Sequence, residues 1–211
     1  SFSNEKIQTF LKDKKIPFSY LSSTEIDIEV SKAIMNGNVV GWFQGRMEFG
    51  PRALGNRSII GDPRIKDMQK KMNLKIKNRE SFRPFAPVIL EEFKEKYFGL
   101  KIESPYMLLT RNLSKEFLVD TKKQIQYEGV SKVNQIRSDL PAITHIDYSA
   151  RVQTVSKQDN KGFRKLLEQW YKETGCPLLL NTSLNIKGMP IVNDLTDAKK
   201  FATMYNVKVY S

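Results

Sequence analysis

Arginine and lysine residues are concentrated between Gly45 and Arg83, in a stretch that opens GRMEFGPRALGNRS and ends KIKNRESFRP. From Arg46 to Arg83 there are eleven Lys or Arg residues and four acidic ones, which is a net charge of +7 out of +12 for the whole chain. Guanidinium groups clasp phosphate or carboxylate with two parallel donors, and N–H groups in glycine-containing turns add a concave anion nest. The stretch therefore predicts an anion-binding site, in preference to a plain solvated basic surface.

The arginines set among turn residues are the first candidates for phosphate binding, and they are Arg46, Arg52 and Arg57. Their alternative role is structural pairing, for instance with Glu48 or Asp62. Arg83 stands between Phe82 and Pro84, where either a stacked structural role or a substrate contact fits. The lysines at 66, 70 and 71 fall on the polar face of an expected helix and are interpreted as solvated charges.

Two buried strands are expected to position these residues. Val39–Phe43 is a continuous apolar run, which is typical of a strand buried on both faces, so the arginine cluster begins where a central strand ends. Ligands favour that edge of an open α/β sheet. Pro177–Leu180 is a second such strand, and three polar candidates follow it directly: Asn181, Ser183 and Asn185.

The remaining pattern alternates helices with strands. Helices are predicted from Ser3 to about Lys14, from Ser23 or Thr24 to Gly37, from Asp62-Pro63 through Ile76, through Phe163–Tyr171 up to Gly175, and from Asp197 to Tyr205. Strands are expected at 104–110, 144–147, 151–155 and 207–209, with an edge strand after the proline-containing segment 82–87. Residues 111–133 read as a polar insertion or loop. The fold class is α/β (mixed α+β), with a twisted mixed β-sheet flanked by helices.

Composition bounds the function. The 211 residues are 40% hydrophobic and contain no apolar run near the ~20 residues that cross a bilayer, so a soluble protein without a membrane partner is expected. A single cysteine, Cys176, suits a reducing cytoplasm. With one histidine and one cysteine, a Cys/His zinc site cannot be assembled within the chain. The chain lacks an initiator Met and a signal-peptide pattern, and is interpreted as a fragment.

Four motifs in order resemble the C-terminal half of the O-carbamoyltransferase family, which includes nodulation-factor, cephalosporin and aminoglycoside antibiotic carbamoyltransferases. The motifs are GWFQGRMEFGPRALGNRSI, IKNRESFRPFAP, THIDYSARVQTV and PLLLNTSLNIKGMPIV. The resemblance spans Ser3 to about Phe201. It implies the fold of threonylcarbamoyl-adenylate synthases (a YrdC-like domain) over residues 37–211, preceded by a helical lead-in over residues 1–36.

The resemblance also implies an activity, namely binding of carbamoyl phosphate and ATP (with Mg²⁺) and formation of carbamoyl adenylate. A kinase-like N-terminal domain would then transfer the carbamoyl group to a hydroxyl acceptor. The metal ion of the transfer step is expected only in that domain, and none in this chain. A homodimer is one arrangement that the sequence allows.

The family's Lys-x-Arg and Ser-x-Asn pairs match this sequence at Lys77, Arg79, Ser183 and Asn185. Lys77 would act as a point charge and Arg79 as a bidentate clamp, and both are assigned catalytic roles. Because residues two apart in a strand point to the same face, each pair is expected to converge on one ligand. Within THIDYSARVQTV, His145 and Arg151 are candidate binding residues, and a general-base role for His145 stays open.

Two alternatives of other classes remain. The net charge would also suit a basic module that binds double-stranded RNA or DNA, for which an open stripe of cations is needed. The second alternative is a non-catalytic docking domain, which would only shape the acceptor pocket of a partner domain. Convergent arginines in a cavity would favour the carbamoyl-adenylate interpretation.

Overall fold

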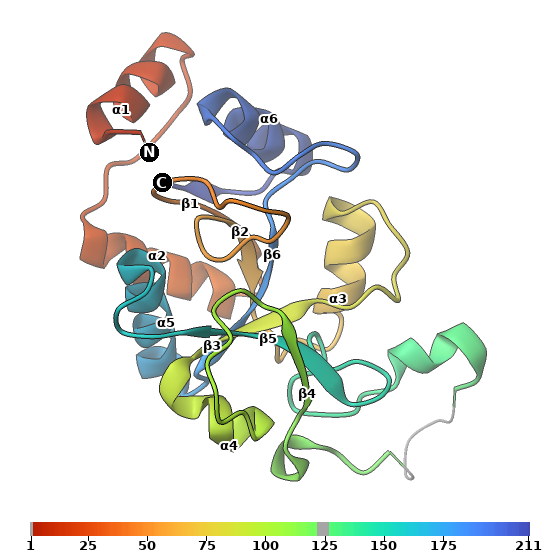
Figure 1. The fold of residues 1–211 in the computed structure, drawn as a ribbon. Coiled ribbons are helices and arrows are strands. Elements are labelled where there is room, and N and C mark those ends of the chain that lie inside the picture. The colour runs from red at the N-terminus through yellow and green to blue at the C-terminus, as the bar shows by residue number, and fades with distance from the viewer. Residues whose placement is uncertain (1, 122–126) are drawn as a thin grey trace.

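A seven-stranded mixed sheet organises the chain in the computed structural model, which describes residues 2–121 and 127–211 (Figure 1). The strands are β1 Val40–Phe43, β2 Arg57–Gly61, β3 Ala86–Leu90, β4 Leu109–Asn112, β5 Ser149–Val155, β6 Leu178–Ser183 and β7 Val209–Tyr210. Their order across the sheet is β4-β5-β3-β6-β2-β1-β7. The β3–β5 and β1–β7 pairs are parallel and the other neighbours are antiparallel, which confirms the predicted mixed sheet.

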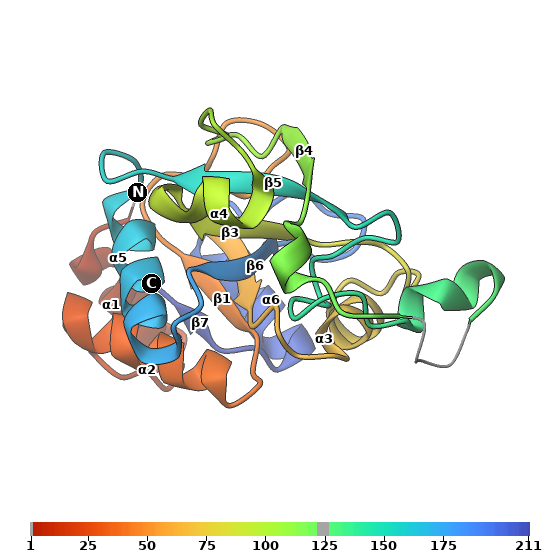
Figure 2. The ribbon, with the colours of Figure 1, turned by 90° about the horizontal axis from the view of Figure 1, so that it is seen from below.

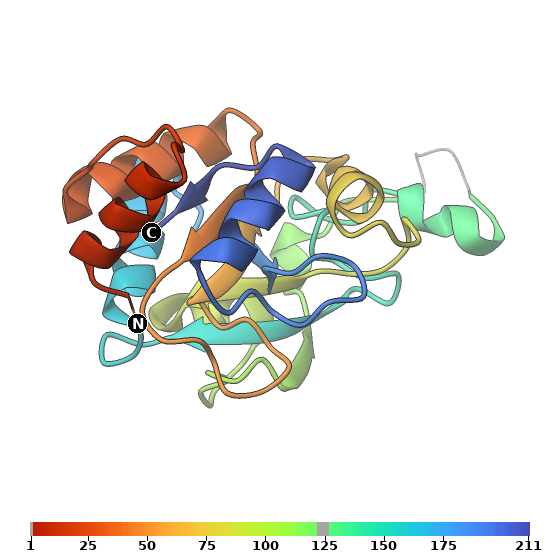
Figure 3. The same ribbon diagram turned by 90° about the horizontal axis from the view of Figure 1, so that it is seen from above.

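Helices cover both faces of this sheet. They are α1 Asn4–Asp13, α2 Ser23–Met35, α3 Met68–Lys71, the π-helical turn Met72–Ile76, α4 Lys94–Phe98, α5 Lys161–Thr174 and α6 Leu195–Tyr205, with short 3-10 turns at Glu91–Phe93, Lys115–Phe117 and Gly129–Asn134. Figures 2 and 3 show α2 beside α5 on one side of the sheet and α3 and α6 on the other. Within the described ranges, no helix has the length and apolar character needed to cross a bilayer.

The helix ends follow the sequence signals closely. The Ser3 side chain caps α1 as predicted, accepting the Lys6 N–H. In α2 the cap is Ser22, one residue before the predicted start, because it forms a reciprocal capping box with Glu25. Gly175 ends α5 with a φ of 69°, in the left-handed conformation expected of a C-terminal glycine.

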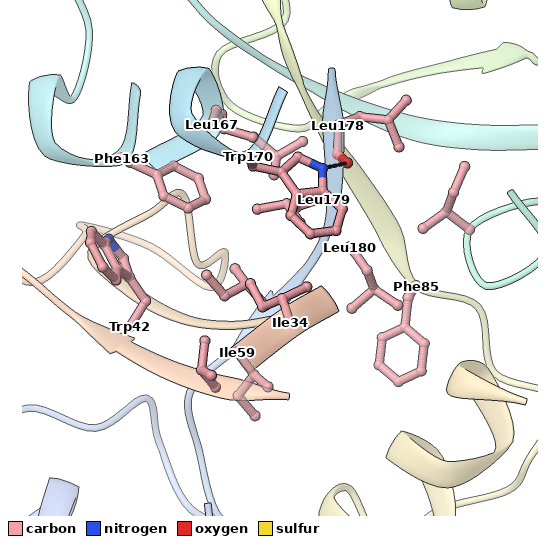
Figure 4. Packing of buried hydrophobic residues seen from close by; sticks show 14 of the residues in the cluster. Ile34, Trp42, Ile59, Phe85, Phe163, Leu167, Trp170, Leu178, Leu179 and Leu180 are labelled. Atoms are coloured by element: carbon pink, nitrogen blue, oxygen red, sulfur yellow. Dashed lines mark hydrogen bonds between the residues drawn. The ribbon is translucent and has the colours of Figure 1, made fainter. Parts of the chain in front are cut away.

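The hydrophobic core lies on both sides of the sheet, and Figure 4 shows residues of the part between α2, α5 and the sheet. Trp170 of α5 is fully buried and donates its indole N–H to the Leu178 carbonyl at 3.0 Å, which ties the helix to β6. Phe163 packs near Trp42 and against Gly55, whose φ is +105°. A Cβ at Gly55 would lie 2.1 Å from the Phe163 ring, so only glycine fits at this point of residues 44–56, which we call the basic loop.

The predicted helix start at Asp62-Pro63 is wrong. The Asp62 carboxylate is not a cap; it accepts the Arg64 backbone N–H and binds the Arg64 guanidinium at 2.8 Å. These local bonds hold a turn, and α3 begins only at Met68. The predicted apolar face is nevertheless present, since Met68, Met72 and Ile76 are buried.

The strand after the proline-containing segment is not an edge strand, because β3 lies between β5 and β6. Pro87 is tolerated there for a reason of register. Leu90 donates its N–H to Pro177 on the β6 side, so by alternation Pro87 faces β5. Pairing of β3 with β5 starts only at Val88, one residue later, so no ladder hydrogen bond is lost.

Two shorter predictions also need correction. Residues 144–147 form a turn rather than a strand, closed by a bond from the Tyr148 N–H to the His145 carbonyl. The strand expected at 104–110 is shifted, since β4 covers Leu109–Asn112, and the buried Ser104 instead bonds to Val152 and Thr154. The polar segment 111–133 contains the 3-10 turn Lys115–Phe117 and most of Gly129–Asn134, and its residues 122–126 lie outside the described part of the chain.

Candidate functional site

Lys77 is the centre of the candidate site. It follows the π-helical turn directly, and its side chain reaches β6, more than a hundred residues away in the sequence. The ammonium donates to the Ser183 carbonyl, to Ser183 Oγ at 3.2 Å and to Asn185 Oδ1 at 2.8 Å. The structure thus brings three of the four residues of the two family pairs into one hydrogen-bonded cluster.

This cluster holds a buried cation among neutral partners. Lys77 is 7% exposed, and burial lowers its pKa from 10.5 to about 7, with a further contribution from the charge of Arg79. Carbonyl, hydroxyl and amide oxygens satisfy its three donors but carry no opposite charge. An incoming anion would supply that charge, so the geometry suits a phosphate or carboxylate ligand.

Arg79 is held beside this cluster with a fixed orientation. Its Nε donates to Asn73 Oδ1 at 2.6 Å, and its guanidinium lies over the Phe85 ring, 5.0 Å from the centroid. The buried Asn73 also binds the carbonyls of Ser81 and Arg83 through its amide nitrogen, so one side chain shapes the whole 79–83 turn. Burial, and then the charge of Arg83, lower the Arg79 pKa.

Lys77 and Arg79 do not lie in a strand, contrary to the expected geometry. The residue between them, Asn78, has a φ of 46°, in the left-handed region. The two side chains therefore take different directions, Lys77 to the end of β6 and Arg79 to Phe85. Lys77 and Arg79 remain close enough for their charges to interact because the chain turns at Asn78, and not because they alternate along a strand.

Ser183 and Asn185 form the facing wall at the end of β6. Ser183 Oγ bonds to Asn185 Oδ1 at 2.7 Å. The Asn185 amide nitrogen donates to the carbonyls of Ile186 and Met189, at 3.1 and 3.2 Å, and so fixes the loop beyond the strand. The Ser-x-Asn pair therefore converges as expected, and it does so on Lys77.

Asn181 lies one step further back on the same strand. It donates to the Ala53 carbonyl at 3.0 Å and to Gln153 Oε1 at 2.8 Å, and Gln153 in turn donates to the Leu54 carbonyl. Asn181 Oδ1 is buried and has no hydrogen-bond partner within the described residues. These amides attach the basic loop to β5 and β6, which places Asn181 in a supporting position behind the loop.

The basic loop, residues 44–56, and the residue that follows it carry two different kinds of arginine. Arg57, the first residue of β2, is 1% exposed and donates to the carbonyls of Gln44 and Asn56 at 2.8 and 2.9 Å, while its guanidinium stacks 3.7 Å from the Phe43 centroid. Its donors hold the loop closed. Arg46 and Arg52 are exposed and available to solvent or ligand.

The nest of N–H groups expected in this loop is present, and Glu48 occupies it. Glu48 Oε1 accepts the N–H groups of Leu54, Asn56 and Arg57 at 2.8, 2.7 and 3.2 Å. The carboxylate is buried, and Oε2 has no hydrogen-bond partner in the described part of the chain. The loop thus uses its own anion to set its shape.

His145, in the turn before β5, and Arg151, in β5, extend the site. A hydrogen bond to the Phe85 backbone links His145 to the ring under Arg79, while burial lowers the His145 pKa. Burial also lowers the Arg151 pKa, and the nearby charge of Arg52 lowers it further, which places these two arginines close together. Arg151 Nε is buried without a hydrogen-bond partner among the described residues.

Arg83 lies at the exposed rim, where it pairs with Glu80 at 2.9 Å. The predicted residues come from separate elements and meet in pairs. The charge of Arg79 acts on Lys77, Arg79 and His145 both contact Phe85, and the charge of Arg151 acts on His145. Sequence reasoning names Glu48 only as a pairing partner of the loop arginines, and it misses two polar residues that support the site, Asn73 and Gln153. A glutamine inside a buried strand pattern is the one signal that could have indicated them.

Within the described residues, no group of three or more His, Cys, Asp or Glu side chains is placed to hold a metal ion. The acids nearest the site are already in use, Glu48 in the nest and Glu80 with Arg83. The donor set is thus suited to anions rather than to a cation.

Comparison with known proteins places these residues in a family. The family model described as carbamoyltransferase C-terminus matches residues 31–210. An uncharacterised protein of Synechocystis is 52% identical over 200 residues, covering 93% of this chain and 32% of its own. Nodulation protein NolO of Bradyrhizobium diazoefficiens is 40% identical (83% and 29% covered), and a 3'-hydroxymethylcephem-O-carbamoyltransferase of Amycolatopsis lactamdurans is 38% identical (80% and 28% covered). The chain spans about a third of the length of these relatives.

Solved structures support the same fold at low identity. Sua5 of P. abyssi in complex with L-threonine aligns with a TM-score of 0.54 and 12% identity, covering 90% of this chain and 47% of its own. Full-length HypF in its phosphate- and nucleotide-bound form aligns with a TM-score of 0.51 and 15% identity, covering 90% and 21%. The fold is therefore the mixed α/β, YrdC-like one that the motifs implied. Because the family model matches residues 31–210, which is most of the chain, the chain belongs to the carbamoyltransferase C-terminal domain family.

Proposed function

We propose that the chain is the carbamoyl-phosphate- and ATP-binding half of an O-carbamoyltransferase, and that it forms carbamoyl adenylate. The observation that carries this proposal is the contact of Lys77 with Ser183 and Asn185. A buried ammonium without an anionic partner, next to a fixed guanidinium, suits a ligand that brings phosphate charge with it.

The reaction has two steps. Water first splits carbamoyl phosphate into carbamate and inorganic phosphate. A carbamate oxygen then attacks the α-phosphorus of ATP, the bond between the α-phosphorus and the bridging oxygen breaks, and pyrophosphate leaves with carbamoyl adenylate as the product. Both steps bring several anions into one cavity, so fixed positive charge is needed to offset their repulsion.

The residues divide this work. Lys77 binds a phosphate oxygen as a point charge, and Arg79 stabilises the charge that develops on the α-phosphate during adenylyl transfer, its guanidinium held by Asn73 and Phe85. Ser183 and Asn185 bind phosphate oxygens or the carbamoyl amide.

The outer cations neutralise the remaining phosphates. They are Arg46, Arg52 and Arg151, with Arg83 at the rim. His145 is a neutral binding residue at pH 7, because burial lowers its pKa.

Arg57 and Asn181 support the site from behind it. The Arg57 guanidinium donates its hydrogen bonds to carbonyls of the loop, and Asn181 binds Ala53 and Gln153. Mg²⁺ enters with ATP as part of the substrate. In the longer proteins of this family, a kinase-like N-terminal domain with its own metal ion would pass the carbamoyl group to a hydroxyl acceptor.

The direct test is ATP–pyrophosphate exchange and AMP release that depend on carbamoyl phosphate. Lys77→Ala and Arg79→Ala should each reduce the rate by about 100-fold or more, the loss typical of removing one fixed donor to transition-state charge. Lys70→Ala removes the same charge from the exposed face of α3 and should change little. A wild-type protein that shows neither turnover nor binding of ATP and carbamoyl phosphate would refute the proposal.

The nucleic-acid alternative predicts a different pattern. The exposed lysines at 66, 70 and 71 form the open face that a duplex would contact, so their substitution should weaken RNA or DNA binding as much as Lys77→Ala does. A steep salt dependence of that binding would support it. A pure docking domain would bind no carbamoyl phosphate in a calorimetric titration.

A further inference from the structure

Asn73 is a fully buried amide within the π-helical turn Met72–Ile76. A buried amide has to form its hydrogen bonds inside the protein, because an unmet donor or acceptor costs free energy. All the hydrogen bonds that its side chain forms within the described residues are made to the segment 79–83. The position of this side chain therefore bears on that segment, which contains Arg79.

The π-helical turn also holds the backbone of Arg79. The Lys77 N–H donates to the Met72 carbonyl at 2.9 Å, and the Arg79 N–H donates to the Asn73 carbonyl at 3.0 Å. Widened helical turns of this kind occur frequently at functional sites. Asn73 thus binds Arg79 twice, through its backbone and through its side chain, so the path of the chain and the direction of the guanidinium are set together.

The side-chain bond occupies one edge of the guanidinium. Asn73 Oδ1 accepts the hydrogen of Arg79 Nε at 2.6 Å, and the Phe85 ring lies against the guanidinium, 5.0 Å from centroid to carbon. In the described part of the chain, the two terminal nitrogens of Arg79 have no hydrogen-bond partner. Because a guanidinium carries five N–H donors in one plane, the four donors at its end stay free for a ligand.

Arg57 shows the opposite use of the same group. Its terminal nitrogens donate to three carbonyls of the basic loop, at 2.8, 2.9 and 3.4 Å. Its Nε is buried and has no hydrogen-bond partner among the described residues. The edge that the protein occupies therefore differs between the two arginines, and only Arg79 keeps the end of its fork for an anion.

We propose that Asn73 is a positioning residue for the reaction, which holds Arg79 so that its two terminal nitrogens face the α-phosphate. A guanidinium can bind two oxygens through its end or through the edge that includes Nε. With Nε held by Asn73, only the end remains, and this fixes two donors toward the oxygens on which charge develops. The inference rests on the proposed function, because it requires a phosphate opposite Arg79.

The test compares two amides of the same helical segment. Asn73→Ala removes the hydrogen bond to Arg79 together with two bonds to carbonyls of the segment 79–83. Gln69→Ala is the matched control, because the Gln69 amide donates to two carbonyls of the same segment, at 3.4 and 3.2 Å, but not to Arg79. Both are made in the wild-type protein and together with Arg79→Lys, which keeps the charge but removes the fork. The measured quantities are kcat and KM for carbamoyl-phosphate-dependent AMP release.

Asn73→Ala should lower kcat by about 10- to 100-fold and leave the KM values for MgATP and carbamoyl phosphate within about threefold. The charge of Arg79 stays in the site, but the orientation on which the transition state depends is lost. Gln69→Ala should leave kcat and KM within about twofold. When Arg79→Lys is already present, Asn73→Ala should lower kcat by less than about threefold further, because no fork is left to orient. Equal losses from Asn73→Ala in both backgrounds would mean that Asn73 only holds the chain segment, and would overturn the inference.

Arg79→Lys alone gives the answer if circular dichroism shows that Asn73→Ala does not fold. A fall in kcat of about tenfold or more with KM within about threefold supports the requirement for an oriented fork, and a kcat near that of the wild type overturns it. In these cases the wild type is active and the proposed function stands. If the wild type releases no AMP and binds neither MgATP nor carbamoyl phosphate, both proposals fail together.

Discussion

Arg164 and Lys77 are two buried cations on opposite sides of the sheet, and their partners differ. The Arg164 side chain is 5% exposed and pairs with Glu92 at 2.6 Å and with Glu168 at 2.8 Å, while also binding the Val155 carbonyl. Burial lowers the pKa of Arg164, but the hydrogen bonds and charges of the two glutamates outweigh it and raise the pKa overall. Lys77 has only neutral acceptors, and its pKa falls to about 7.

This difference separates a cation that completes the fold from one that a ligand completes. The charge of Arg164 is compensated within the chain, so it contributes to stability and needs nothing further. Folding buries the charge of Lys77 at a cost in free energy, and that charge is compensated only when an anion binds. Burial without a counter-ion is therefore the feature that marks the site, and net charge along the sequence is not.

The largest expected effect comes from Lys77→Met, which should separate activity from stability. Carbamoyl-phosphate-dependent AMP release should fall by about 100-fold or more, because the fixed charge is lost. The free energy of unfolding should stay within about 1 kcal/mol of the wild type or rise, since an uncompensated buried charge is replaced by an apolar chain of similar length. Urea titration and the AMP assay on the same preparation measure both.

The converse is expected for Arg164→Met. The Val155 carbonyl and both glutamates lose their donor, and because the glutamates are about half exposed, water replaces part of that loss. We expect destabilisation of about 2–3 kcal/mol in urea titration, with AMP release per folded molecule unchanged within about twofold. A loss of activity without a loss of stability would contradict the comparison.

Most of the fold could be predicted from local patterns, because the buried strands Val40–Phe43 and Leu178–Ser183 and the helix Lys161–Thr174 carry strong apolar and capping signals. The errors arose where a side chain bonds locally in a way the pattern does not encode. Asp62 binds Arg64 instead of capping a helix. Pro87 fits in a central strand because it precedes Val88, the residue at which β3 begins to pair with β5, so the N–H group that proline lacks is not needed there.

The site was predictable in its members but not in their geometry. Lys77, Ser183 and Asn185 were identified through motif resemblance, and only the fold shows that they touch. Arg57 and Arg46 are indistinguishable as turn arginines in the sequence, yet one is buried under three carbonyls and the other is exposed. Glu48 is named in the sequence only as a pairing partner for these arginines, and its role as acceptor for three backbone N–H groups is visible only in the fold.

Glu48 provides the next test, because it shapes the loop that carries the exposed arginines. Glu48→Ala leaves three N–H groups, one buried and two partly buried, without their acceptor and should destabilise the protein by about 2 kcal/mol. It should also weaken carbamoyl phosphate binding, since Arg46 and Arg52 lose their fixed positions.

Glu48→Gln retains an oxygen that can accept the same bonds and should recover most of both losses. Chemical denaturation and calorimetry on the two variants distinguish a shape-setting role from a requirement for the negative charge. If Gln behaves like Ala, the charge opposite Arg57 matters more than the hydrogen bonds do.

The smallest expected effect is a pH dependence that belongs to Lys77 alone. The unfolded lysine holds its proton up to about pH 10.5, and the folded one only up to about pH 7. Between these values the unfolded state binds more protons, so this residue makes the free energy of unfolding rise with pH, by about 1 kcal/mol per unit, and its penalty is fully expressed below pH 7. Lys77→Met should lack this slope, so the stability advantage of the variant should shrink from pH 7 to pH 9 in urea titrations.

Arg164→Lys and Lys70→Met serve as controls, since residue 164 is paired with two glutamates and Lys70 is exposed on α3, and neither change should remove the slope. Phosphate binding should show the opposite trend to stability. An anion binds the charged form of Lys77, so above pH 7 the site must take up a proton on binding, and the affinity for carbamoyl phosphate should fall by up to about tenfold per unit. An affinity that is flat from pH 7.5 to pH 9 would mean that Lys77 keeps its proton in the free protein, and that the contrast with Arg164 lies in geometry and not in charge.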